Sequence, residues 1–297
     1  MTRSTLPLTT GTTTDSTILP NFIYIGTSKA GSTWIFNLLS HHPDVFMVPN
    51  KGLYFFDSHY DRGLDWYLSH FAASGDYRVR CEISHSYLHS NNACQRIAEL
   101  NPDVKLMVCV REPADRAFSE YLDLVKNNRF RGTFEEALRE RPSLTDYGRY
   151  YTHLRPYYEQ FGPDRIFVAV FDDIKNAPAE LVERMFSFLD IKHVVKSAHV
   201  TQNVNAGGIP RFAPLVRSAK WGSKTLKRLG MRRPVGFAKR SAVIKNVLYR
   251  PFTERNRPAM HEEMRVMLRN KYQEEIRQFD DLVGTNLRSL WGYVSDY

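Results

Sequence analysis

The sequence predicts an α/β fold built on a mostly parallel sheet with helices on both faces. Short apolar runs bounded by turn residues alternate along the chain with segments of helical periodicity, which is the pattern of parallel strands joined by helices. The 297 residues are 42% hydrophobic and 25% charged, enough for one sizeable core. The sequence shows no internal repeat and no run of about 18 apolar residues that would cross a membrane.

Four apolar segments are expected to form the strands of this sheet. Strands that are covered on both faces are apolar at consecutive positions, as in three of these segments, 22–26, 104–111 and 165–174. The four segments span residues 22–26, 77–84, 104–111 and 165–174.

Seven helices are expected between and after the strands. Pro113 stands at the first position of one helix, and Thr133 with Glu136 forms a capping-box pattern at the start of another. An asparagine is expected to cap the second helix. The helices span 32–42, 91–101, 113–128, 133–140, 145–162, 177–191 and 258–284. The last one carries an apolar stripe suited to core packing, made of Met260, Met264, Leu268, Tyr272, Ile276 and Phe279.

The domain organisation is predicted as a disordered tail over residues 1–20 and a single domain over 21–297. Within that domain a basic, mostly helical insert is expected at about 205–257. Residues 205–260 hold fourteen lysines or arginines and one acid, so they carry +13 of a chain whose net charge is +9. The segment is either a solvated insert or a surface for an anionic membrane or an anionic substrate. No recognised nucleic-acid motif accompanies it, so nucleic acid is not expected as a partner.

The cysteines and the first residues indicate a cytoplasmic protein. Cys81, Cys94 and Cys109 have neither CxxC spacing nor a histidine pattern, so we expect reduced thiols and no disulfide framework. The first twenty residues lack the apolar segment of a secretory signal. We therefore expect a cytoplasmic enzyme, with peripheral contact to the inner membrane surface through residues 205–260 as a further option.

The segment GTSKAGST, residues 26–33, is typical of an anion-binding loop. It lies between a predicted strand and a predicted helix, whose unpaired amides and dipole attract negative charge. Its two glycines let the backbone approach a phosphate, its Ser-Thr pair offers hydroxyl donors, and Lys29 adds a mobile charge. A nucleotide-triphosphate P-loop would place lysine directly after the second glycine, where this chain has Ser32. The alternative interpretation is a plain strand-to-helix turn.

A second strand–turn–helix segment, VCVREPADRAFSEY, predicts another phosphate site. Arg111 stands at the end of its strand, and Ser119 lies two turns into the helix that follows. Because the carboxyl ends of parallel strands gather at one edge of a sheet, both motifs are expected there, and two sites suggest a nucleotide phosphorylated at both ends. The alternative is that Arg111 and Arg116 pair with Glu112 and Asp115.

With both motifs in place, the chain resembles the sulfotransferases that use 3′-phosphoadenosine-5′-phosphosulfate (PAPS). It is similar to the branch shared by bacterial enzymes and the Golgi heparan-sulfate and glycan sulfotransferases, and the lack of a signal or anchor leads us to expect a bacterial enzyme. The resemblance covers residues 20–192 well and 258–292 moderately. It implies a three-layer, P-loop-like parallel sheet, PAPS as cofactor, PAP as product and no metal. The expected reaction moves a sulfuryl group to a hydroxyl or phenol of a small molecule, a glycan or a lipid.

The resemblance also assigns the cofactor-binding residues one by one. The first loop is matched to the 5′-phosphosulfate, through Lys29, Ala30, Gly31, Ser32, Thr33 and Trp34. The second motif is matched to the 3′-phosphate, through Arg111 and Ser119. Tyr150 takes a family position near the nucleotide, and Arg211 is the candidate in the loop that covers it. Lys29 is also assigned to catalysis, because a cation can stabilise charge that develops on the leaving phosphate.

The catalytic base is where the chain departs from the family pattern. The family usually has a glutamate three residues before a pair of phenylalanines, and this chain has Gly52 there. His85, at the end of the strand 77–84, is the expected replacement, and Glu82 is either the base or a residue that orients Lys29 or His85. A structural histidine is the alternative, as is an acceptor that needs no base, such as a phenol or an amine.

Two rival functions stay open at this stage. A P-loop-type nucleoside or sugar kinase would use ATP with Mg²⁺, and the displaced lysine and the lack of a second acidic motif for a metal speak against it. A catalytically inactive protein that binds PAPS or PAP would fit the glycine at the usual base position.

Overall fold

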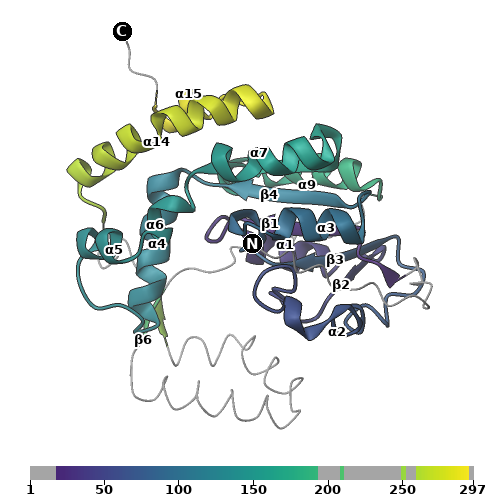
Figure 1. Cartoon of the computed structure of the whole chain (residues 1–297). Coiled ribbons are helices and arrows are strands. Elements are labelled where there is room, and N and C mark those ends of the chain that lie inside the picture. The colour runs from purple at the N-terminus through teal and green to yellow at the C-terminus, as the bar shows by residue number, and fades with distance from the viewer. Residues whose placement is uncertain (1–17, 193–207, 211–248, 252–258, 294–297) are drawn as a thin grey trace, which may run out of the picture. The chain divides into compact units, whose positions relative to one another are not determined.

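The computed structural model describes residues 18–192, 208–210, 249–251 and 259–293 (Figure 1). The chain divides into two compact units. Unit 1 comprises residues 1–110 and 153–200, and unit 2 comprises residues 111–152 and 201–297. The prediction of a single domain over 21–297 stays a prediction, and so does the tail at 1–20, of which only 18–20 are described.

Unit 1 is built on a five-stranded sheet in the order β2-β3-β1-β4-β5. Every neighbouring pair is parallel, and all five residues of β1 are buried. Because β1 lies between β3 and β4, the loops that follow β1 and β3 leave the same edge of the sheet side by side. The strands are β1 (Phe22–Gly26), β2 (Val45–Met47), β3 (Val79–Ile83), β4 (Lys105–Val110) and β5 (Ile166–Val170).

Helices flank this sheet and pack in pairs. His42, just after α1 (Ser32–Leu39), meets Phe186 of α9 (Pro178–Leu189) with ring centroids 4.8 Å apart. Cys94 of α3 (Ala93–Leu100) contacts the carbonyl of Pro156 in α7 (Tyr150–Phe161). The shorter elements of unit 1 are η2 (Tyr60–Arg62), α2 (Leu64–Leu68), η3 (Tyr87–His89), η4 (Pro163–Arg165) and α8 (Phe171–Asn176). The predicted α/β class with a parallel sheet between helices is confirmed.

Unit 2 is mainly helical. Its long helix α14 buries Leu268, Tyr272, Ile276 and Phe279, whereas Met260 and Met264 of the predicted stripe are only half-buried. Tyr272 donates to the carbonyl of Thr145 at 2.8 Å, which ties α14 to α6. The elements are α4 (Pro113–Lys126), α5 (Phe134–Glu140), α6 (Ser143–Asp146), β6 (Gly208–Pro210), β7 (Tyr249–Pro251), α14 (Glu262–Val283) and α15 (Leu287–Trp291).

Some local predictions are confirmed and others are wrong. The capping box of Thr133 and Glu136 is present, but Asn92 makes no side-chain cap. The strand predicted to reach residue 174 ends at Val170, because two aspartates open the helix α8, where negative charge is favourable. The helix predicted over 145–162 is broken at Gly148, where a Cβ would come within 2.9 Å of the Tyr272 ring. The strand β2 was not predicted.

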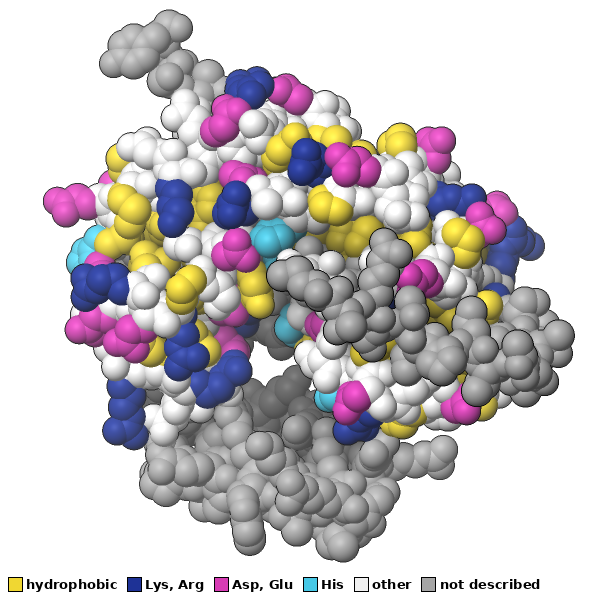
Figure 2. Space-filling model, viewed as in Figure 1, with side chains coloured by type: hydrophobic (Ala, Val, Ile, Leu, Met, Phe, Trp, Pro, Cys, Tyr) yellow, Lys and Arg dark blue, Asp and Glu magenta, His cyan; other side chains and the backbone are white. Residues whose placement is uncertain are grey.

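Several sequence predictions concern chemistry rather than folding. Cys81, Cys94 and Cys109 are free thiols, of which Cys81 and Cys109 are buried. Among the described helices none is long and apolar enough to span a membrane. Most of the basic insert at 205–257, together with Arg211, lies outside the described residues. On the face shown in Figure 2, the described lysines and arginines are interspersed with acidic side chains.

Candidate active site

The loop after β1 has a backbone that depends on its glycines. Lys29 and Gly31 have positive φ angles of 67° and 92°. A Cβ on Gly31 would collide with the side chain of Ile174, and one on Gly26 would lie 2.8 Å from the Cβ of Leu88. The loop is therefore folded tightly against its neighbours, so that Ser32 and Thr33 start α1 directly after it.

Lys51 reaches this loop from the segment after β2. Its Nζ atom donates to Oγ of Ser32 and to Oγ1 of Thr33, both at 2.9 Å. Burial, together with the smaller repulsion from the Lys29 ammonium, lowers the pKa of Lys51 to about 8. The start of α1 thus holds two hydroxyls and two lysines. The sequence analysis missed Lys51, although it stands next to the glycine that departs from the family pattern.

The floor of the loop is fixed by polar contacts. The hydroxyl of the buried Thr27 is hydrogen-bonded to Nε2 of His89 at 3.0 Å. The amide of Thr27 donates to the carbonyl of Cys109 at 3.1 Å. The His89 ring packs edge-on against the His153 ring, with centroids 4.7 Å apart. These contacts hold the first residue of the loop to β4 and η3.

Glu82, predicted as a base or an orienting residue, is enclosed at the end of β3. Its side chain is buried, and Tyr67, Ser84 and Tyr87 each donate a hydroxyl to it at 2.9 Å. Burial raises the pKa of Glu82 to about 7, against the three hydrogen bonds, which lower it. The three donors occupy both carboxylate oxygens, an arrangement that suits positioning of the strand end.

His85 forms a hydrogen-bonded pair with Tyr54. The Tyr54 hydroxyl lies 2.7 Å from Nε2 of His85, and their rings pack edge-on at 5.4 Å. Gly52 makes room for this pair, because a Cβ on it would lie 2.8 Å from the Tyr54 hydroxyl oxygen and closer still to the ring. The phenol therefore fills the space where a glutamate side chain at position 52 would begin. Burial raises the pKa of Tyr54, so the phenol keeps its proton at neutral pH.

The segment 51–54 connects the two groups of residues. Its first residue, Lys51, is bonded to the start of α1, and its last, Tyr54, is bonded to His85. The amides of Gly52 and Tyr54 donate to Ile83 and Ser84 at the end of β3. The lysine–hydroxyl cluster thus lies at one end of this four-residue strap, and the phenol–imidazole pair lies at the other end.

The second predicted phosphate motif lies in unit 2. Tyr150 donates to the carbonyl of Arg111 at 2.6 Å, and Glu112 caps α4 by accepting from two of its amides. Tyr293 donates to Glu112 at 2.7 Å. Contacts of Tyr150, of the Glu112 side chain and of Tyr293 therefore fix the turn that carries Arg111. Both Arg111 and Ser119 are half-buried. Arg116 bonds Glu120 and the carbonyl of Leu144, and the alternative pairing of Arg111 and Arg116 with Glu112 and Asp115 stays open.

Four residues assigned to the cofactor by resemblance are buried, namely Ala30, Ser32, Trp34 and Tyr150. Tyr150 is fully buried, and its hydroxyl serves the backbone at Arg111. Trp34 is 4% exposed and packs in the core behind the loop. Their contact with the nucleotide stays a prediction, and so do the assignments of the other site residues.

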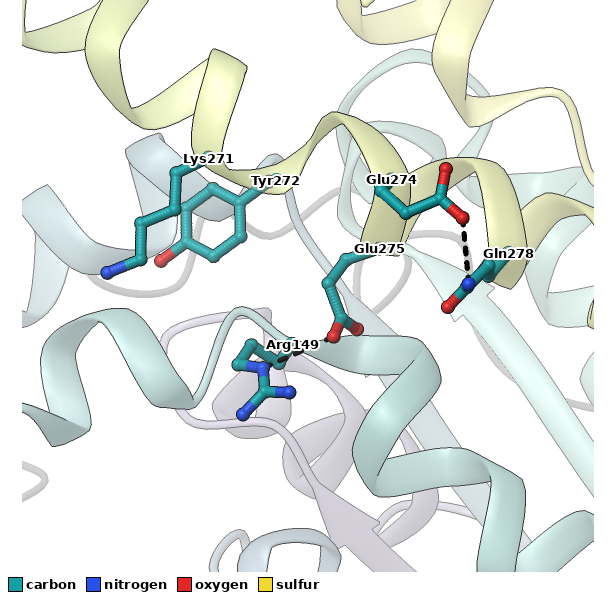
Figure 3. A pocket seen from close by; sticks show the side chains of 6 residues that line it. All are labelled: Arg149, Lys271, Tyr272, Glu274, Glu275 and Gln278. Atoms are coloured by element: carbon teal, nitrogen blue, oxygen red, sulfur yellow. Dashed lines mark hydrogen bonds and ion pairs between the residues drawn. The ribbon is translucent and has the colours of Figure 1, made fainter.

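A surface hollow of about 250 Å³ in unit 2 is separate from these motifs (Figure 3). Glu275 accepts from Arg149 at 3.2 Å and from the amide of Thr152 at 3.1 Å, so the charged groups there serve to cap α7. The hollow is lined by Arg149, Lys271, Tyr272, Glu274, Glu275 and Gln278. Among the described residues no cluster of His, Cys, Asp or Glu suits a metal.

Comparison with known proteins decides the family. The sulfotransferase domain model matches residues 19–206, more than half of the chain. The chain belongs to the sulfotransferase family. The resemblance to PAPS-dependent sulfotransferases is therefore confirmed, and so is the reaction class, transfer of a sulfuryl group. The kinase alternative is set aside.

The relatives of this sulfotransferase include enzymes named for heparan sulfate. Heparan sulfate glucosamine 3-O-sulfotransferase 6 of Homo sapiens is 30% identical over 251 residues, which cover 80% of this chain and 70% of that protein. Heparan sulfate glucosamine 3-O-sulfotransferase 3A1 of Mus musculus is 29% identical over 198 residues, 64% of this chain and 50% of that protein. The crystal structure of a sulfotransferase from Alicyclobacillus acidocaldarius matches with a TM-score of 0.66 and 22% identity, over 91% of this chain and 98% of that one.

Proposed function

We propose that the protein transfers the sulfuryl group of PAPS to an alcohol hydroxyl, with the loop 26–33 binding the 5′-phosphosulfate and His85 taking the acceptor proton. The observation that carries this proposal is the strap 51–54, which joins the cation and hydroxyl cluster to the Tyr54–His85 pair within unit 1. Anion binding and proton removal are thereby served by neighbouring groups.

The residues at the start of α1 fit an anionic group. Ser32 and Thr33 supply hydroxyl donors, and Lys29 and Lys51 supply positive charge. The helix α1 begins directly after Gly31, and the unpaired amides at its start favour an anionic ligand. When bound, PAPS supplies the activated sulfuryl group.

In the transfer, the acceptor oxygen forms a bond to sulfur while the bond from sulfur to the bridging oxygen breaks. The electron pair of that bond goes to the 5′-phosphate of the product PAP, and Lys29 stabilises the charge that develops there. The acceptor proton goes to the imidazole of His85, whose Nε2 lies 2.7 Å from the Tyr54 hydroxyl. A base fixed by a third group is the arrangement that activates hydroxyl nucleophiles.

An alcohol is the acceptor group we propose, because a positioned base is useful to a weakly acidic hydroxyl and unnecessary for an acidic phenol. The heparan sulfate enzymes among the relatives make a glycan the first acceptor to try, followed by small-molecule and lipid alcohols. The test incubates the full chain with ³⁵S-labelled PAPS and a panel of these alcohols, and follows label transfer by mass spectrometry. Transfer to an alcohol supports the proposal, and transfer confined to phenols or amines contradicts it.

Arg111→Ala is expected to remove most of the preference for PAP over 5′-AMP. The 3′-phosphate is assigned to Arg111 and Ser119, and one lost charged contact costs roughly tenfold or more in affinity. Calorimetric titration of wild type should show tighter binding of PAP than of 5′-AMP. Lys29→Ala should weaken both ligands alike, since both carry a 5′-phosphate. Equal affinities in wild type would contradict two separate phosphate sites.

Turnover is expected to survive EDTA at full rate. The sulfuryl group carries less charge than a γ-phosphoryl group, and the proposal gives charge stabilisation to lysine instead of Mg²⁺. Initial rates with labelled PAPS, before and after chelation, measure this. Loss of activity that Mg²⁺ alone restores would contradict it.

A bacterial source, a cytoplasmic location and contact of residues 205–260 with an anionic membrane stay predictions. One relative, the membrane-associated sulfotransferase kil1 of Dictyostelium discoideum, is 32% identical over 106 residues, 35% of this chain. It favours testing the membrane option with anionic vesicles.

A further inference from the structure

Lys51 occupies a position that the phosphosulfate loop does not need for its own folding. The glycines and the Thr27 contacts already define the loop, yet a lysine from another segment is brought to the first two residues of α1. Its ammonium lies 2.9 Å from each hydroxyl, beside a second lysine of like charge. Burial and a like charge both disfavour the Lys51 ammonium, and an anion bound at the two hydroxyls would offset that cost.

We propose that Lys51 is a second cofactor-binding lysine, which directs the hydroxyl protons of Ser32 and Thr33 toward the 5′-phosphate or phosphosulfate and adds its own charge to the site. An ammonium is a donor only, so both hydroxyl oxygens accept from it. Each hydroxyl then has its proton available for a third group. This inference rests on the proposed function of the loop.

The charge state of Lys51 gives the proposal a signature. In the protein without ligand, burial and the nearby Lys29 lower the pKa of Lys51 to about 8. A bound dianion favours the charged ammonium and raises that pKa. The affinity for the ligand is therefore highest below pH 8. It falls by up to about tenfold per pH unit as the pH rises from 8 to the pKa of Lys51 in the complex.

The experiment must distinguish Lys51 from the other titratable groups on the surrounding elements. They are Lys29 on the loop, Tyr54 on the strap, and Glu82 and His85 at the end of β3. All of them are kept in Lys51→Arg and Lys51→Met. The phosphates of PAP have their second pKa near about 6, so measurements between pH 7 and 9.5 avoid their titration.

The experiment measures binding of PAP to the full chain by calorimetry across that pH range, in two buffers of different ionisation enthalpy. Wild type should bind PAP more weakly above pH 8 and take up a proton on binding. Lys51→Met should bind about tenfold to hundredfold more weakly at pH 7 and take up no proton there or at pH 8.5. Lys51→Arg, whose guanidinium stays charged, should keep much of the affinity and lose the pH dependence.

The outcomes separate this inference from the function on which it rests. If wild type binds PAP and Lys51→Met matches its affinity and its pH profile, Lys51 is not a ligand residue and the proposed function stands. A pH dependence retained in Lys51→Arg likewise overturns the inference, because another group then titrates. If wild type binds no PAP at any pH, both the inference and the proposed function fail.

Discussion

Replacing Lys29 with alanine is expected to lower kcat for sulfuryl transfer by about 10²–10³-fold, the usual cost of losing one preorganised donor to developing charge. Lys29 is the lysine within the loop, between Gly26 and Gly31, and its backbone has a left-handed φ of 67°. The charge it meets is largest when the bond from sulfur to the bridging oxygen breaks. The effect should therefore exceed the accompanying loss of PAP affinity.

Two further variants separate charge from backbone strain. Alanine adopts a left-handed backbone poorly, whereas asparagine tolerates it, so Lys29→Asn removes the charge at a lower conformational cost. If charge is what counts, both variants should be equally slow, and Lys29→Arg should recover part of kcat. Lys192→Ala, an exposed lysine in the same unit, is the matched control and should behave as wild type. A Lys29→Asn variant with near wild-type kcat would contradict the assignment.

The sequence predicts most of the sheet because β1, β4 and β5 are runs of consecutive apolar residues. Most residues of β1, β3, β4 and β5 are buried, and these strands can be recognised in the sequence without knowing how their side chains pack. β2 has three residues, too few for a periodicity, and it forms because β3 offers it a parallel edge. The break at Gly148 likewise depends on the ring of Tyr272, more than a hundred residues away.

The site is predictable where a motif carries it and not where tertiary contacts do. The spacing of the glycines and hydroxyls within residues 26–33 is enough to predict an anion-binding loop. Lys51 and Tyr54 lie in a segment with no regular pattern, and their roles depend on a strap that runs from α1 to β3. The glycine at 52 was visible as a departure from the family. Only the position of the Tyr54 ring shows what replaces the glutamate.

His85→Ala is expected to lower kcat with alcohol acceptors by about 10²–10⁴-fold, the usual worth of a general base, and to leave PAP affinity nearly unchanged. The imidazole is bonded to Tyr54, which lies outside the loop 26–33, so its removal is expected to spare the cofactor site. Rates should be measured against pH with one alcohol acceptor. Wild type should lose activity in acid, because a protonated imidazole cannot accept a proton, and the variant should lack this limb. His41→Ala, an exposed histidine at the end of α1, is the control.

Variants of Tyr54, the hydrogen-bond partner of His85, distinguish a catalytic base from a structural histidine. Tyr54→Phe keeps the ring that fills the space beside Gly52 and removes only the hydroxyl that lies 2.7 Å from Nε2. It should lower kcat less than His85→Ala and shift the acid limb, since the imidazole loses the group that orients it. Gly52→Glu alone should not rescue His85→Ala, because its side chain would collide with the Tyr54 ring and its φ of 81° disfavours any Cβ. Rescue is expected only when Tyr54→Ala vacates that space. A His85→Ala enzyme with near wild-type kcat on an alcohol would eliminate this base, whatever the Tyr54 variants do.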